Sequence, residues 1–292
     1  MAVGGRVIRL AVLSDVHGNL PALEAVLEDA QLRDVYGIIV AGDLSGGPEA
    51  DQTVRRLLSF RHWMVRGNSD LNLLRYAEDL APPEWRTSRQ YALLRWGYQF
   101  NHYETLRLLR TLPEQLVIVI PGTASIRVVH GSPRDAFEGL SPDEPEALET
   151  AMAQADEPVL VCGHTHIPWQ QERSGRLVLN PGAVCGPLNG DVRAQYALLT
   201  WDGSHWLAEH HAPAYDLASI SASFHDSGLL EQGGALARGS LLSIQTGRNV
   251  ALAFLDHAYA VAAAAGHLHC KVVPDECWDE AALTFDWETA AE

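Results

Sequence analysis

The sequence predicts an α/β protein, because short aliphatic segments alternate with segments of helical periodicity. The aliphatic runs 10–13, 35–41 and 62–65 are each bounded by turn residues, which is typical of buried strands. Residues 20–30 and 51–60 lie between these runs and carry apolar side chains at helical spacing. Each aliphatic run ends in a polar cluster. In α/β sheets, ligand sites form at such strand exits.

Later segments extend the predicted sheets. Residues 115–120 and 125–129 predict a strand pair around Pro121-Gly122, and 158–162 and 176–179 predict further aliphatic strands. Residues 194–201 and 205–211, separated by Asp202-Gly203, predict a hairpin. An acidic helix is expected over 142–155.

Two segments break the alternation and define the predicted domains. Residues 71–113 are rich in Leu, Arg, Tyr and Trp and are interrupted by Pro82-Pro83. They predict two or three helices, over 71–79, 86–96 and 102–112, that form a lid. From residue 213 a helical pattern dominates, with 11 acidic and 3 basic residues over 213–292. We therefore expect a core over 1–212 with a helical lid insertion at 71–113, followed by an acidic helical C-terminal extension over 213–292.

Composition narrows the function classes. The 292 residues are 47% hydrophobic and 20% charged, as in an ordinary globular protein. The net charge of −16 argues against general nucleic-acid binding and against binding to anionic membranes. The chain has no apolar run of the ~18 residues that a membrane span needs. The N-terminus carries no signal-peptide pattern, and four scattered cysteines form no disulfide framework, so a cytoplasmic location is expected.

Metal-ligating side chains recur at five predicted strand ends. Taken singly, each has an ordinary structural interpretation, such as a turn closure, an Asx-turn or a buried core histidine. Together, a set of imidazoles, two carboxylates and an amide suits two divalent cations bridged by one carboxylate. The residues in question are Asp15, His17, Asp43, Asn68, His130, His164 and His166.

These motifs resemble a known family, the calcineurin-like metallophosphoesterases. The matching segments are Asp15-Val16-His17, Gly42-Asp43, Gly67-Asn68, His130-Gly131 and Gly163-His164-Thr165-His166, in order along residues 6–211. Gly67-Asn68-Ser69-Asp70 and Asn180-Pro181-Gly182 look most like the small bacterial and archaeal phosphodiesterase branch. The resemblance implies a four-layer αββα sandwich of two mixed β-sheets, with a dinuclear metal site at one end.

The resemblance also implies roles for individual residues. Asp15, His17 and His166 would hold one metal, Asn68, His130 and His164 the other, and Asp43 would bridge them. A bridging hydroxide would attack phosphorus in line with the leaving oxygen. Asp70 would orient a ligand imidazole through its other nitrogen, and Asn19 and Asn180 would supply supporting hydrogen bonds, Asn19 towards the substrate. Manganese is the first expectation for the two divalent ions, with Fe or Zn as alternatives.

One position departs from the family pattern. Many relatives have histidine after the Gly-Asn pair, where it protonates the leaving oxygen, whereas this chain has Ser69. Because general acid catalysis contributes roughly 10²–10⁴-fold, we expect phosphoanhydrides or activated esters to be better substrates than alkyl monoesters. His102, in the insertion, is the one candidate replacement.

The insertion suggests how a substrate is bound. Arg75, Arg89 and Arg95 could hold phosphates beyond the scissile one, and Trp85, Tyr91, Trp96 and Tyr98 could stack on a base. The alternative is that these aromatic residues form the core of the lid while the arginines solvate its surface. His267-Leu268-His269-Cys270 with Cys277 could form an extra zinc site, but the spacing fits no known finger or ribbon.

The leading hypothesis is a dinuclear-metal phosphoesterase that hydrolyses phosphodiesters or nucleotide phosphoanhydrides. Its substrate would be a small phosphorylated molecule, with nucleotides included. One alternative is a serine/threonine protein phosphatase of the same family, which Ser69 and the insertion disfavour. The other is a non-catalytic metal-binding scaffold, which the full set of ligands disfavours. The extension either packs on the core or mediates homo-oligomer formation, and the sequence leaves both open.

Overall fold

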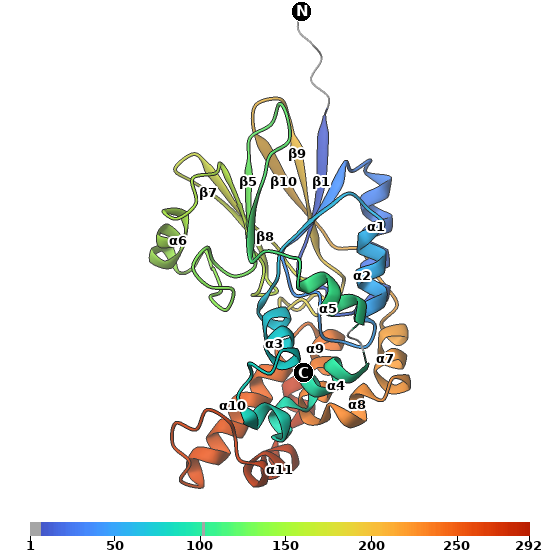
Figure 1. Ribbon diagram of the computed structural model, residues 1–292, viewed down its shortest axis with the longest axis vertical. Coiled ribbons are helices and arrows are strands. Elements are labelled where there is room, and N and C mark those ends of the chain that lie inside the picture. The colour runs from blue at the N-terminus through green and yellow to red at the C-terminus, as the bar shows by residue number, and fades with distance from the viewer. Residues whose placement is uncertain (1–6, 101–102) are drawn as a thin grey trace, which may run out of the picture.

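Two mixed five-stranded sheets form the centre of the computed structural model, which describes residues 7–100 and 103–292 (Figure 1). The first sheet has the order β10-β9-β1-β2-β3, with β1 (Ile8–Leu13), β2 (Gly37–Val40), β3 (His62–Met64), β9 (Tyr196–Trp201) and β10 (Trp206–His211). The second has the order β4-β5-β6-β8-β7, with β4 (Gln115–Ile118), β5 (Ile126–Val129), β6 (Val159–Val161), β7 (Pro168–Arg173) and β8 (Arg176–Pro181). In each sheet three parallel strands lie next to antiparallel ones.

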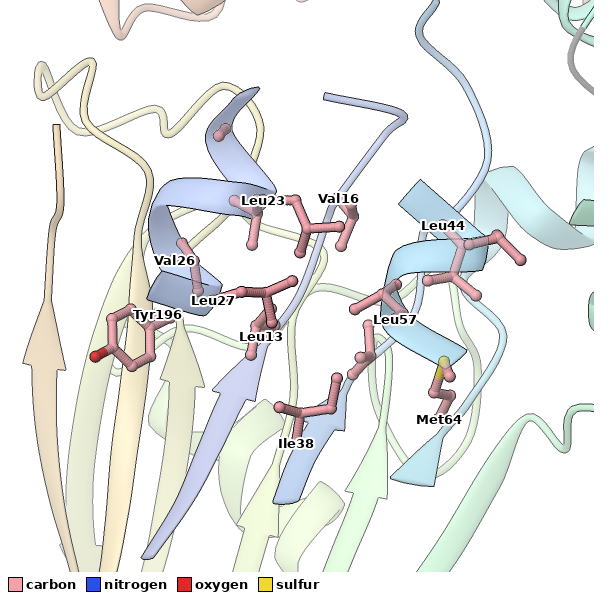
Figure 2. Packing of buried hydrophobic residues seen from close by; sticks show 14 of the residues in the cluster. Leu13, Val16, Leu23, Val26, Leu27, Ile38, Leu44, Leu57, Met64 and Tyr196 are labelled. Atoms are coloured by element: carbon pink, nitrogen blue, oxygen red, sulfur yellow. The ribbon is translucent and has the colours of Figure 1, made fainter. Parts of the chain in front are cut away.

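The sheets pack face to face, which explains the continuous aliphatic character of β1. Leu10 and Val12 point between the sheets and pack in one cluster with Val128 and Leu179 of the second sheet. The alternate residue Leu13 faces the other way, towards helices α1 (Leu20–Leu32) and α2 (Ala50–Leu58). Figure 2 shows Leu13 beside Leu27 of α1, and Leu57 of α2 further along the same cluster, near Met64. A strand buried on both faces needs apolar side chains at every position.

The second sheet is covered on its outer face by α6 (Pro145–Met152), whose Leu148 and Met152 pack on Leu160 and Val178. The layers therefore run helix, sheet, sheet, helix, and the predicted αββα sandwich of two mixed sheets is confirmed.

Strand β7 was not expected from the sequence. Its residues Pro-Trp-Gln-Gln-Glu-Arg lack an aliphatic pattern because β7 lies at the sheet edge and pairs only with β8. Ser174 and Gly175, both with positive φ, form the tight turn between the two strands.

The expected lid helices differ in detail from the observed ones. Helix α3 (Asn68–Ala77) begins at one of the candidate ligands, and the segment expected as one helix over 86–96 is instead η1 (Pro83–Arg86), η2 (Arg89–Tyr91) and α4 (Ala92–Phe100). The break has a local cause, since the Ser88 side chain accepts a hydrogen bond from the Gln90 amide and caps η2. Helix α5 (Tyr103–Leu109) packs on the core beside α2 through Leu106 and Leu109.

Residues 83–100 pack against the C-terminal helices, and we call residues 83–100 and 217–291 together the helical cap. Trp96 of α4 lies in one apolar cluster with Phe224, Leu241 and Ile244. Figure 1 shows the cap beyond the sheets, on the side opposite the N-terminus. Its C-terminal helices are α7 (Leu217–Asp226), α8 (Leu229–Gln232), α9 (Gly234–Thr246), α10 (Val250–Ala264), α11 (Asp275–Thr284) and α12 (Trp287–Ala291). In the part of the chain that the structure describes, no helix combines the length and apolarity that crossing a bilayer requires.

Candidate metal centre

The seven candidate ligands come from loops at the carboxyl ends of parallel strands, and the fold brings them together. Asp15 and His17 follow β1, Asp43 follows β2, and Asn68 follows β3. The remaining three follow strands of the second sheet, His130 after β5 and His164 and His166 after β6. Because the two sheets pack with these ends on the same side, both contribute to one cluster.

One group of ligand atoms surrounds Asp15. The Oδ1 atom of Asp15 lies 3.3 Å from His166 Nε2, which in turn lies 3.3 Å from His17 Nε2. The ligand atoms of these three residues all lie within 4.8 Å of one another.

A second group surrounds Asn68. Its Oδ1 atom lies 2.9 Å from both His130 Nε2 and His164 Nδ1. Asp43 stands between the groups, with Oδ2 3.6 Å from His17 Nε2 and 3.5 Å from His130 Nε2.

The same kind of contact, from Nδ1 to a backbone carbonyl oxygen, orients three of the imidazoles. The Nδ1 atoms of His17, His130 and His166 lie 3.0, 2.7 and 2.8 Å from the carbonyl oxygens of Ser45, Ala41 and Gly186, respectively. An Nδ1–H that donates to a carbonyl leaves Nε2 unprotonated, which is the form that binds a metal. Sequence reasoning missed these partners because a backbone carbonyl carries no residue-type signal.

The electrostatics of the group fit a cation. Asp15 is fully buried, and its Oδ1 accepts no hydrogen bond although it faces the imidazoles. Burial by itself would raise the pKa of Asp15, but the nearby positive charges of His166, His130 and His17 lower it. Burial would likewise lower the pKa of His166, yet the Asp15 carboxylate raises it to about 9. An orphaned buried oxygen beside imidazole nitrogens is the donor set that a divalent ion satisfies.

The backbone around the ligands is unusual. Among the described non-glycine residues, nine have positive φ, and five of these are the candidate ligands Asp15, His17, Asp43, His164 and His166. Such conformations cost roughly 1–3 kcal/mol each and cluster at functional sites. Glycines permit the crowding. A Cβ on Gly67 would lie 2.0 Å from Asp43 Oδ1, and Gly42 (φ +95°) lies against the His130 ring.

The structure places Asp70 and Asn19 differently from expectation. Among the described residues, no imidazole is hydrogen-bonded to Asp70. Its carboxylate instead accepts hydrogen bonds from the amides of Leu44, Ser45 and Gly67, because it stands in the first turn of α3 where those donors converge. Asn19 is fully buried and caps α1 by accepting a hydrogen bond from the Ala22 amide.

Two further polar side chains support the ligand loops. Asn180 donates to the carbonyl of Gly163 and to Thr165 Oγ1, which braces the loop that carries His164. Ser69 donates through its amide and its hydroxyl to the two carboxylate oxygens of Asp43, both at 2.9 Å.

The structure does not bring the lid arginines to the centre. Arg89 pairs with Asp279 at 2.6 Å, and Arg95 donates to the carbonyls of Trp85 and Ser88. Arg75 is exposed, and its guanidinium lies over the Phe137 ring. His102 lies outside the described residues.

Two of the insertion's aromatic contacts and the C-terminal cysteines lie within the helical cap. Trp85 stacks on Tyr91, and Trp96 packs in the cap core. Cys270 and Cys277 belong to no metal-binding group found among the described residues.

A cavity of about 510 Å³ opens from the centre. His17, His164, His166 and Ser69 line one end of it, and residues of α4, α9 and α10 line the rest. The centre is therefore reached between the core and the helical cap.

Comparison with known proteins agrees with this geometry. The sequence pattern of the calcineurin-like phosphoesterase superfamily domain matches residues 8–204. The chain is 28% identical over 207 residues to the uncharacterized protein MJ0912 of Methanocaldococcus jannaschii, covering 65% of this chain and 81% of that protein. It is 27% identical over 212 residues to the phosphodiesterase YfcE of Escherichia coli K12, covering 67% of this chain and 89% of YfcE.

A solved structure extends the likeness. The metallophosphoesterase from Sphaerobacter thermophilus superposes with a TM-score of 0.66 at 30% identity, over 82% of this chain and 99% of that one. The fold and the sequence likeness define a metallophosphoesterase. The chain belongs to the calcineurin-like phosphoesterase superfamily.

Proposed function

We propose that this protein is a phosphoesterase that uses two divalent cations to hydrolyse phosphodiesters, with nucleotide phosphoanhydrides as the second substrate class. Asp15, His17 and His166 would hold one cation and Asn68, His130 and His164 the other. The observation that carries the proposal is the position of Asp43 Oδ2, 3.5–3.6 Å from an imidazole nitrogen of each group. A carboxylate oxygen between two groups of ligands is suited to bridge two metals.

Bound cations would supply a nucleophile at neutral pH and neutralise charge on the phosphoryl oxygens. The residues of the chain hold that arrangement. Carbonyls orient the imidazoles, and Ser69 holds Asp43 through two hydrogen bonds. Because Ser69 stands where relatives carry a histidine and a hydroxyl is no acid near neutral pH, the proposal favours leaving groups that depart without protonation.

Three observations bear on the alternatives. The resemblance to YfcE, a phosphodiesterase by name, supports diester hydrolysis. The complete ligand set speaks against a non-catalytic scaffold, and the cap over the centre speaks against a protein phosphatase, since a protein substrate needs an open surface. Manganese is the first ion to test, with Fe and Zn as alternatives, since imidazole, carboxylate and amide ligands suit all three.

The test is hydrolysis by metal-stripped protein reloaded with Mn²⁺. Bis-p-nitrophenyl phosphate, p-nitrophenyl phosphate and a dinucleoside tetraphosphate are assayed side by side, with Asp43→Asn as the blank and metal content measured for both proteins. We expect turnover of the diester and at least ~100-fold less in the blank. Two bound metals per chain without turnover of any of the three would refute the enzymatic proposal.

A further inference from the structure

The cavity beside the metal centre continues well past the ligands. From His164 and His166 it runs between α4 on one side and α9 and α10 on the other. Figure 1 shows α4 and α9 near one another in the cap, at the end of α3 that points away from the sheets. A volume of 510 Å³ falls in the range of pockets that enclose small organic ligands.

The wall of this cavity is predominantly apolar and, apart from the histidines, uncharged. Apart from the histidines of the centre, its lining residues in the described part of the chain include no lysine, arginine, aspartate or glutamate. Neutral polar side chains such as Asn72 and Ser240 are interspersed. The large apolar side chains include Leu93 and Leu94 of α4, Leu236 and Ile244 of α9, and Leu255 of α10.

Two arginines of the segment that carries α4 have other partners. Arg89 pairs with Asp279 of α11 on the cap surface, and Arg95 donates to two carbonyls within its own segment. A second phosphate in the cavity would thus lose its hydration without gaining a cationic partner, which is strongly unfavourable.

We propose that the substrate carries a single phosphoryl group joined to an uncharged apolar group, and that this group binds in the cavity between α4 and α9–α10. The inference rests on the proposed function for the phosphoryl end. Between the two substrate classes proposed above, it selects phosphodiesters that carry an apolar group over polyphosphates, with a leaving group, such as a phenol, that departs without protonation. The insertion and the C-terminal extension would together form the specificity pocket.

Three phosphates with one organic group each test this. Methyl phosphate, hexyl phosphate and hexane-1,6-diyl bisphosphate are compared as competitive inhibitors of the Mn²⁺-loaded enzyme. Full burial of five methylenes sets an upper limit of roughly 1,000-fold in affinity. We expect hexyl phosphate to bind at least ~10-fold more tightly than methyl phosphate, and the distal phosphate of the bisphosphate to abolish that advantage.

A binding measurement that needs no turnover accompanies the inhibition assay. The neutral fluorescent probe N-phenyl-1-naphthylamine is titrated into the full-length protein, with and without Mn²⁺, and then displaced with hexyl phosphate. We expect saturable binding in both states and displacement in the Mn²⁺-loaded protein.

Variants locate the binding. A Cβ on Gly97 of α4 would meet nothing within 4 Å, so Gly97→Phe adds a ring inside the cavity without a backbone clash. We expect it to reduce the hexyl advantage below threefold and to weaken probe binding ~10-fold. Ser240→Phe, from the opposite wall, is expected to do the same. Ala253→Phe places the same ring on the exposed face of α10 and should change neither measurement.

The outcomes separate this inference from the proposed function. Equal affinity for methyl and hexyl phosphate, tighter binding of the bisphosphate, or probe binding unaffected by both cavity variants would overturn the inference while leaving the esterase intact. Probe binding that is lost in Gly97→Phe and Ser240→Phe, in a protein that turns over no phosphoester, would support the apolar cavity and refute the proposed function.

Discussion

Asp70 is the residue whose role the structure changed most, and Asp70→Asn tests that role. Its buried carboxylate accepts hydrogen bonds from the amides of Leu44, Ser45 and Gly67 at 3.3, 2.8 and 2.9 Å. The Ser45 carbonyl in turn holds His17, and Gly67 precedes Asn68. Asp70 is thus a positioning residue that ties together the loops after β2 and β3.

The hydrogen bonds of Asp70 set the expected loss in the free energy of unfolding. Asparagine offers one acceptor oxygen, so one buried amide loses its partner, which costs about 1–3 kcal/mol. The other two hydrogen bonds lose their charge, at about 1 kcal/mol each. Part of this is offset, because burial and the nearby negative charge of Asp43 raise the pKa of Asp70 and make its ionised form unfavourable. We expect a net loss of about 2–4 kcal/mol in the free energy of unfolding.

The assay is urea unfolding of the metal-free proteins together with calorimetric titration of Mn²⁺. Loss of a residue that supports metal ligands typically weakens metal affinity ~10–100-fold. The matched control is Asp51→Asn, since Asp51 also accepts three hydrogen bonds, from the Glu104 amide and from the amide and hydroxyl of Thr105. It caps α5 away from the centre, so it should lose about 0.5–1.5 kcal/mol and no metal affinity.

Unchanged Mn²⁺ affinity in Asp70→Asn would refute the positioning role. So would an equal loss of affinity in the Asp51→Asn control, because the effect would then follow general destabilisation.

Three further predictions concern the centre and the core. Gly67→Ala should lower the free energy of unfolding, measured by thermal unfolding, by at least ~2 kcal/mol, because the added Cβ would lie 2.0 Å from an Asp43 oxygen. Gly97→Ala is the control. It lies in an open helical position and should raise the free energy of unfolding by up to ~1 kcal/mol. Removing metal with a chelator should lower the melting temperature by several degrees. Adding Mn²⁺ at ~100 times its dissociation constant should raise the free energy of unfolding by about 2.7 kcal/mol per site. Asp15→Asn should not show this gain. If Mn²⁺ still raises the melting temperature of that variant by the same amount, Asp15 is not a ligand. Burial alone would raise the pKa of Glu157, but the hydrogen bonds from Arg127 lower it. That pair therefore stabilises the fold above the ordinary carboxyl pKa of 4.5 and loses its effect as the pH falls through the lowered value. Glu157→Gln should lower the free energy of unfolding at pH 7 by up to ~1 kcal/mol, and the difference from the unsubstituted protein should shrink as the pH falls below 4.5. A difference that does not depend on pH would contradict this reasoning.

The sequence alone was sufficient for the fold class and for the set of candidate ligands. Aliphatic runs buried on both faces are visible as strands without any tertiary information, as in β1 and β2. Asp15-Val16-His17 and Gly163-His164-Thr165-His166 are local motifs, and in an α/β sheet the order of strands places such motifs at one edge. The family followed from those motifs and was confirmed over residues 8–204.

Only the tertiary structure decided what each supporting residue does. The partners of Asp70 are backbone amides more than twenty residues away, apart from Gly67, and the imidazoles are oriented by carbonyls that no residue type announces. The sequence suggested Arg89 as a phosphate ligand, but in the folded chain it pairs with Asp279, 190 residues further along. The apolar cavity likewise arises where α4 meets α9 and α10. Hydrogen bonds and packing between distant segments depend on three-dimensional proximity, which a local pattern does not encode.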